Sequence, residues 1–174
     1  MGTSILFIMF SLYNFLNFVF HFSMARLLGP ASYGILAFLM SLVYIYSVPS
    51  EAIQNLISKY ASKFNSQRQN KKIKFLMLKA LRKSFKIAFI LFLISIIAAL
   101  FLSKFFSINF WLILLTNILI FSSFSVPVIR GILQGRKKFS LLGSSMVAES
   151  TLKLFFSISL VIFGWKILGA MVGV

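Results

Sequence analysis

The 174-residue chain contains no cysteine, one histidine and only two acidic residues. Without cysteine the chain can form neither a disulfide framework nor a cysteine-ligated metal site. Two carboxylates and a single histidine are too few for a metal cluster, and nothing in their spacing indicates paired acid–base groups. The nine glycines are scattered and form no phosphate-binding loop. We therefore expect no enzymatic activity, no metal and no cofactor.

Apolar residues dominate what the chain does contain. It is 60% hydrophobic and 11% charged, with a mean hydropathy of +0.98, whereas a soluble domain is about 45–50% apolar and about 25% charged. A water-soluble globule of this size could not bury so much apolar surface. The formal charge of +16 indicates nucleic acid or an anionic membrane as a partner. Together with the hydropathy it favours the membrane, so membrane lipids are expected partners and nucleic acid is not.

The long uncharged runs predict an all-α, polytopic membrane helix bundle, because about 20 residues of helix cross the hydrocarbon layer. We expect five full transmembrane helices and a truncated sixth. The five cover about residues 4–28, 31–59, 84–104, 107–133 and 139–163, and the partial sixth covers 165–174. The last segment is too short to span, so it is expected to be an interfacial stub or the sign of a fragment of a longer chain.

Lysine and arginine predict the orientation. Ten lie from Lys59 to Lys86, in and beside the loop after the second predicted span, and four lie from Arg130 to Lys138, in and beside the loop after the fourth, whereas three lie on the opposite side. Loops rich in these residues stay cytoplasmic. The sequence therefore predicts a multi-pass protein of the cytoplasmic membrane with its N-terminus in the cytoplasm.

The first large basic loop contains an amphipathic segment at about residues 71–86. We expect this segment to be a helix that lies on the anionic leaflet and anchors the third span, in preference to a docking site for a specific lipid or partner. One face of the expected helix is formed by Ile73, Leu76, Met77, Ala80, Leu81 and Ser84.

Two opposite charges lie deep in the fifth predicted span. Glu149 and Lys153 are four residues apart, with the acidic residue first, which is the favourable order on a helix. Each charge costs about 2.5–3.5 kcal/mol at the bilayer centre, so an interior partner or a wet cavity is expected. Two interpretations stay open: a pair that neutralises itself, or a polar cavity that contacts a charged substrate.

A polar stripe runs along the second predicted span. Glu51, Asn55 and Lys59 follow one another at four-residue steps, and Pro49 is expected to break the helix just above them. The stripe could line a passage or pack against another helix. The passage is slightly favoured, because carbonyls freed by proline are best tolerated beside water or protein.

The other embedded ionisable groups carry weaker indications. Arg26, at the outer end of the first span, is most simply a snorkelling interfacial arginine. Arg130 follows Pro127 at the cytoplasmic end of the fourth span, where a solvated charge is favoured. His21 has no evident partner in the sequence and is expected to be packed and hydrogen-bonded.

Two stretches resemble motifs of the polysaccharide-lipid flippases, which belong to the multidrug/oligosaccharidyl-lipid/polysaccharide exporter superfamily. Ala25–Gly34 (ARLLGPASYG) resembles the turn between the first two helices of that family. Arg130–Phe139 (RGILQGRKKF) is similar to its cytoplasmic link between helices four and five, and Gly164–Gly173 to the beginning of helix six. The matches follow the order of the family along the chain.

The resemblance implies two six-helix halves around a central cavity that opens to each side in turn. Such proteins move a lipid-linked oligosaccharide, carried on a diphosphate, from the cytoplasmic to the outer leaflet. This chain would be the N-terminal half without most of its sixth helix. Because a two-bundle transporter cannot alternate with one bundle, a missing C-terminal half or a second bundle is an expected partner, and these residues alone are not expected to transport anything.

The expected cargo is therefore a lipid-linked anionic glycan. A drug or cation antiporter of the same superfamily is the nearest alternative, but it should place acidic residues in its interior, and here Lys153 offsets the buried carboxylate. The third hypothesis is a membrane assembly subunit without transport activity. The candidate substrate-binding residues are Arg26, Glu51, Asn55, Arg130, Glu149 and Lys153. Of these, Arg26, Lys153 and Arg130 would attract the diphosphate.

Overall fold

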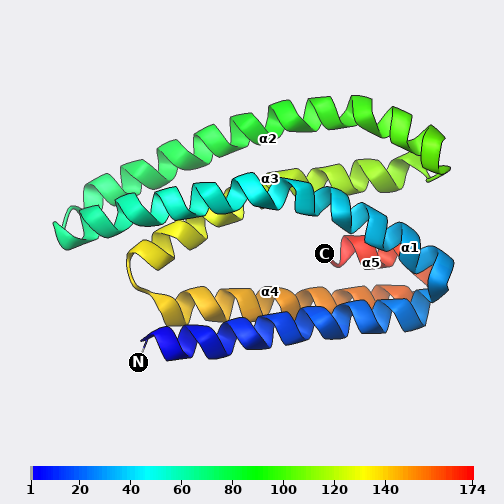
Figure 1. Cartoon of the computed structure of the whole chain (residues 1–174), viewed down its shortest axis with the longest axis horizontal. Coiled ribbons are helices and arrows are strands. Elements are labelled where there is room, and N and C mark those ends of the chain that lie inside the picture. The colour runs from blue at the N-terminus through cyan, green and yellow to red at the C-terminus, as the bar shows by residue number, and fades with distance from the viewer. Residues whose placement is uncertain (1) are drawn as a thin grey trace. The chain divides into compact units, whose positions relative to one another are not determined.

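The computed structural model describes residues 2–174, and these form helices joined by short turns (Figure 1). The elements are α1 (Gly2–Ser66), α2 (Asn70–Phe106), α3 (Phe110–Gly135), α4 (Phe139–Leu160), the π-helical turn η1 (Val161–Trp165) and α5 (Lys166–Val172). No strand occurs within residues 2–174. Four helical stretches are long and apolar enough to cross a membrane. The predicted all-helical class is confirmed, and these four stretches indicate a membrane protein.

The predicted count of five full spans and a truncated sixth is not matched. The first two predicted spans belong to the single element α1, and the predicted sixth follows α4 within one apolar stretch, Phe139–Val172. Inside α1 only Gly29 leaves helical backbone angles, with φ 74° and ψ 170°. Such angles are open to glycine and strained for other residues, so the helix breaks at one residue without a loop. Pro49 does not break α1, contrary to expectation.

The chain divides into two compact units. Met1–Ser41 and Ser140–Val174 form one, which we call the terminal unit, and Leu42–Phe139 forms the other, the central unit. The boundary falls within α1, twelve residues beyond Gly29.

In the terminal unit, the first part of α1 runs beside α4 (Figure 1). Gly143 permits the close approach, because a Cβ atom there would collide with the side chain of Met9. After α4 the chain turns at η1, where Gly164 has φ 91°, and α5 folds back on α4. The buried Ser157 hydroxyl donates a hydrogen bond of 3.2 Å to the backbone carbonyl of Ala170 and fixes this reversal.

In the central unit, two glycines on α3 bring that helix against the second part of α1. A Cβ atom on Gly131 would lie 2.7 Å from the backbone oxygen of Gln54, and one on Gly135 would lie 2.5 Å from that of Ser58. Small residues four apart let helix backbones meet closely in membranes, where packing drives association. Both glycines lie inside the Arg130–Phe139 motif, so these two motif residues serve helix packing.

The second helix of the central unit differs from the sequence prediction. α2 is continuous from Asn70 to Phe106, so the expected surface helix at 71–86 and the third span form one element. The apolar face that was expected to meet lipid packs against α1 and α3 instead. The cluster comprises Ile57, Ala61, Ile73 and Ile132, with Leu76, Met77 and Ala80 packed against it. Periodicity identifies an apolar face but not what covers it.

Further along, α2 and α3 share a second cluster formed by Ala88, Ile120 and Phe124. One polar contact joins the two helices there: the buried Asn117 side chain donates to the backbone carbonyl of Ser95 at 3.2 Å. Such a bond satisfies an amide that would otherwise be costly among apolar groups.

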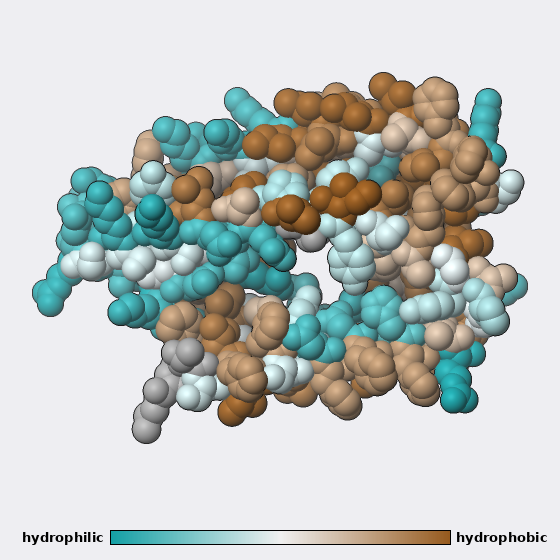
Figure 2. Space-filling model, viewed as in Figure 1, coloured by the Kyte–Doolittle hydropathy of each residue, from teal (hydrophilic) through white to brown (hydrophobic). Residues whose placement is uncertain are grey.

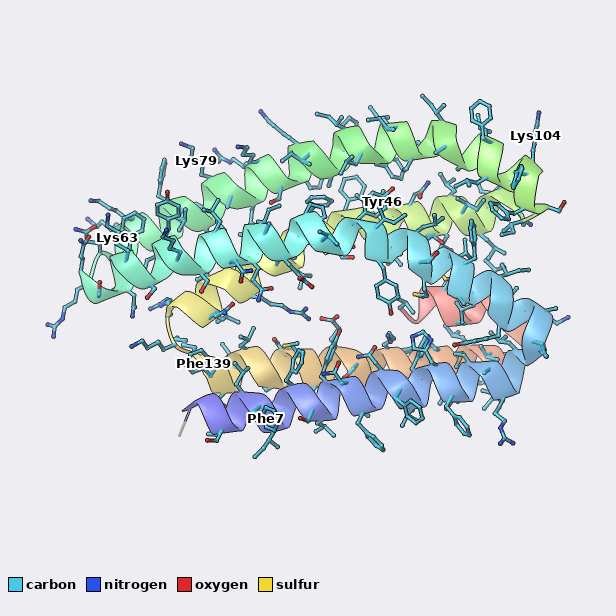
Figure 3. The ribbon with its side chains drawn as sticks, viewed as in Figure 1. Phe7, Tyr46, Lys63, Lys79, Lys104 and Phe139 are labelled. Atoms are coloured by element: carbon cyan, nitrogen blue, oxygen red, sulfur yellow. The ribbon has the colours of Figure 1, made fainter. Side chains whose placement is uncertain are left out.

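The surface of the central unit changes character from one end to the other. Phe101 and Phe105, near the end of α2, are 73% and 82% exposed. Hydrophilic residues gather around the turn between α1 and α2 (Figure 2). Lys63 and Lys79 lie at that end, and Lys104 lies at the other (Figure 3). The exposed apolar side chains between them are typical of a surface that faces lipid.

Candidate functional site

The six candidate substrate-binding residues divide equally between the two units. The terminal unit contains Arg26, Glu149 and Lys153, and the central unit contains Glu51, Asn55 and Arg130.

Lys153 is the best-defined of the six. It is half-buried on α4, and its Nζ atom donates a hydrogen bond of 2.6 Å to Oδ1 of Asn17 on α1. The same Nζ atom lies 4.3 Å from the centroid of the Phe20 ring. Asn17 and Phe20 are three residues apart and so share one face of α1. A charge-assisted hydrogen bond contributes about 1.5–3 kcal/mol, and a cation over an aromatic face about 0.5–2 kcal/mol.

Glu149 lies one helical turn before Lys153 on α4. Its side chain is exposed and attracts the Lys153 ammonium electrostatically. Asn17 and Phe20 also contact the ammonium directly.

Two contacts were not predicted from the sequence: that of Asn17 with Lys153 and that of Tyr33 with His21. Nδ1 of His21 and the hydroxyl of Tyr33 share a hydrogen bond of 3.2 Å, so His21 has the partner that the sequence did not reveal. Asn14, Asn17 and His21 recur at steps of three and four residues. That spacing puts three polar side chains on one face of an otherwise apolar helix, and it could have indicated a polar stripe.

Arg26 is exposed, and its guanidinium carbon lies 5.2 Å from the centroid of the Phe22 ring, one turn earlier on α1. It is three residues before the break at Gly29. An exposed arginine stacked on its own helix fits the interfacial role favoured by the sequence.

In the central unit, Glu51 and Asn55 are exposed on α1. The side of α1 that packs against protein carries Ile57 and Ala61 instead. The polar stripe therefore lies away from this packed side.

Arg130 is half-buried on α3, next to the close approach at Gly131. Near it, Nε2 of Gln54 donates a hydrogen bond of 3.1 Å to Oε1 of Gln134, which joins α1 to α3. No local pattern could indicate this amide pair, because the two residues are 80 positions apart.

Within residues 2–174, no group of three histidine, cysteine or acidic residues is placed to hold a metal ion. No known protein family, curated protein or solved structure matches the chain at a significant level. The fold thus defines an all-helical protein with four stretches able to cross a membrane.

Proposed function

We propose that the chain is the N-terminal bundle of a transporter that moves a lipid-linked oligosaccharide across the cytoplasmic membrane by alternating access. The observation that carries the proposal is the Lys153 ammonium, which Asn17 and Phe20 hold in position between two apolar helices. Charged groups embedded in membrane helices mark substrate and ion pathways, because their cost has to be offset by a function or a partner.

The sign of the embedded charge favours an anionic cargo over a cationic one. Asn17 and Phe20 position the ammonium but add no countercharge, and Glu149 is the acidic group near it. A diphosphate offers several oxygens that can accept hydrogen bonds from a lysine ammonium. An antiporter for cationic drugs should instead place unopposed carboxylates in its interior, whereas Glu149 lies beside Lys153.

Five crossings fit the helix directions better than four. Met9 meets Gly143, and eight residues further along α1 Asn17 meets Lys153, so α1 and α4 run in the same direction. Two parallel membrane helices need an odd number of crossings between them. We infer that α1, about 97 Å long at 1.5 Å per residue, crosses twice with Gly29 at its outer turn. The three crossings between its first part and α4 are then the second part of α1, α2 and α3, and α5 begins a sixth helix.

The charge distribution supports a cytoplasmic N-terminus in this arrangement. The turn between α1 and α2 and the turn between α3 and α4 then lie in the cytoplasm with fourteen lysines and arginines, and the opposite side has three. The two motifs that resemble the flippases also acquire physical roles. Gly29 forms the break in the first motif, and Gly131 and Gly135 close the packing in the second.

A binding measurement tests the cargo. Purified chain in lipid nanodiscs should bind a polyprenyl diphosphate at least about tenfold more tightly than the uncharged polyprenol, since a charge-assisted hydrogen bond contributes about 1.5–3 kcal/mol. Lys153→Met should remove most of this difference. Lys104→Met is the matched control, because Lys104 is an exposed lysine at the end of α2 and should leave affinity unchanged.

Equal affinity for the two lipids, or an unchanged preference in Lys153→Met, would contradict the proposal. Transport is tested separately, by measuring surface polysaccharide in cells that depend on the protein. Arg26→Ala and Lys153→Ala should lower the yield at normal protein levels. Unchanged yield from both would favour the assembly subunit without transport activity.

A further inference from the structure

The side of α2 that faces away from α1 and α3 carries an exposed stripe of large apolar residues among basic ones. Phe75, Leu78 and Phe85 are 66%, 43% and 56% exposed. Arg82 lies on the same stripe, at steps of three and four residues from its neighbours, and Lys71, Lys79 and Lys86 flank it. We call this surface the outer face of α2. It lies opposite the packed face that contains Ile73 and Ser84.

The outer face continues without a shift into the apolar half of the helix. Three exposed residues continue it after Phe85, at steps of four, four and seven residues: Phe89, Leu93 and Leu100. They lie in the stretch that can cross a membrane. The stripe that meets lipid in the span is therefore the same stripe that carries Phe75 and Leu78 in the basic segment.

The length of α2 leaves its basic segment beyond the hydrocarbon layer. Between Lys86 and Lys104 the helix has 17 residues, about 26 Å, which nearly matches the layer. The preceding part from Asn70 to Phe85 is a further 16 residues, about 24 Å. If α2 stood upright, this part would hold Phe75 in water. A strong tilt of α2 would lay the outer face on the headgroups, and the 26 Å part would then cross less than the full layer.

We propose that the outer face of α2 binds the surface of an anionic lipid leaflet. Phe75, Leu78 and Phe85 insert at the boundary of the acyl chains, and the basic side chains contact lipid phosphates. This differs from the sequence prediction in the face that meets lipid, and it is independent of any cargo that the protein carries.

Charge complementarity identifies the occupant as anionic. The chain has no acidic residue between Glu51 and Glu149, so the basic segment has no carboxylate of its own between those positions to balance it. Nζ of Lys79 lies 5.8 Å from the centroid of the Phe75 ring, so the cation and the aromatic group form one surface. The continuity with the lipid-facing stripe favours a leaflet over an acidic protein, because lipid already meets the rest of that face.

The absence of cysteine allows a direct test on the whole chain. Leu78→Cys carries a fluorescent label on the outer face, and Gln67→Cys carries it on the exposed turn between α1 and α2 as the matched control. Both proteins are reconstituted into phosphatidylcholine vesicles with and without about 30 mol% phosphatidylglycerol, a composition that gives an anionic surface. Quenchers attached to the lipid chains report contact with the acyl boundary.

The label at position 78 should be quenched by lipid in the anionic vesicles, and the label at position 67 should not. Adding Lys79→Gln should lower the ratio of lipid-contacting to water-exposed label about fivefold, since one basic residue near such a surface contributes a factor of this size. Quenching at position 78 should also weaken at high salt.

Two results would overturn the proposal. One is equal water exposure of the labels at positions 78 and 67 in anionic vesicles, because the segment would then project upright. The other is that poly-glutamate shields the label at position 78 from water whether or not anionic lipid is present. That result would assign the outer face to an acidic macromolecule.

Discussion

Replacing Gly135 by alanine tests the packing at the centre of the Arg130–Phe139 motif. The added methyl group would lie 2.5 Å from the backbone oxygen of Ser58, 2.6 Å from Cβ of Ala61 and 2.9 Å from the backbone nitrogen of Ser62. None of these atoms can rotate away, because all belong to the backbone or are attached directly to it. Ordinary contacts begin at 3.4 Å, so α1 and α3 must separate by about 0.9 Å (3.4 minus 2.5).

The cost follows from that separation. A gap of about 0.5–1 Å forfeits a quarter to a half of the dispersion energy across a contact, and overpacking typically costs about 1–3 kcal/mol. Alanine favours the helix more than glycine does, and this offsets up to about 1 kcal/mol of the loss in stability. We therefore expect Gly135→Ala to lower the free energy of unfolding by about 1–2 kcal/mol. Gly34→Ala is the matched control, because no atom beyond its chain neighbours and the adjacent backbone of its own helix would lie within 4 Å of its methyl group.

Reversible unfolding in mixed micelles, followed by circular dichroism, measures both variants. Gly34→Ala should be as stable as the unchanged chain or up to about 1 kcal/mol more stable. If Gly135→Ala proved as stable as Gly34→Ala, the close approach of α1 and α3 would be wrong.

The other predictions use the same unfolding measurement. Gly29→Ala should lower the free energy of unfolding by about 1–3 kcal/mol, because alanine is strained at the positive φ of this position. An unchanged stability would refute the break of α1 at Gly29. Asn17→Leu should cost about 1–3 kcal/mol because the Lys153 ammonium loses its acceptor. The double variant Asn17→Leu, Lys153→Met should regain much of the lost free energy of unfolding. If the costs of the two single substitutions simply added in the double variant, the contact between Asn17 and Lys153 would be excluded. For Gln54→Leu and Gln134→Leu, a double-mutant cycle should give a coupling of about 0.5–1.5 kcal/mol, and zero coupling would rule out the amide pair.

The helical class was predictable because it depends on local properties of the sequence. Long uncharged runs favour helices that satisfy their own backbone hydrogen bonds in lipid, and this holds whatever the helices contact. The number of separate helices was not predictable in the same way. Gly29 breaks α1 within one residue, and Pro49, the stronger helix breaker by propensity, lies in continuous helix.

The features that could not be predicted from the sequence depend on contacts between segments that are far apart along the chain. Periodicity placed Ile73, Leu76 and Met77 on one face of α2, but whether lipid or protein covers that face depends on where α1 and α3 lie. The embedded position of Lys153 was evident from its apolar neighbours. Its acceptor Asn17 is 136 residues away, so only the fold could identify it.

The way in which Lys153 is held bears on whether its role is structural. A buried ion pair stabilises a protein no better than well-packed apolar residues of similar size, so stability alone does not explain a cation at this position. Asn17 and Phe20 orient the ammonium, and neither of them is charged. If the cation served packing alone, the Asn17→Leu, Lys153→Met pair would retain the preference for a diphosphate lipid. Loss of that preference in a stable double variant would separate binding from packing.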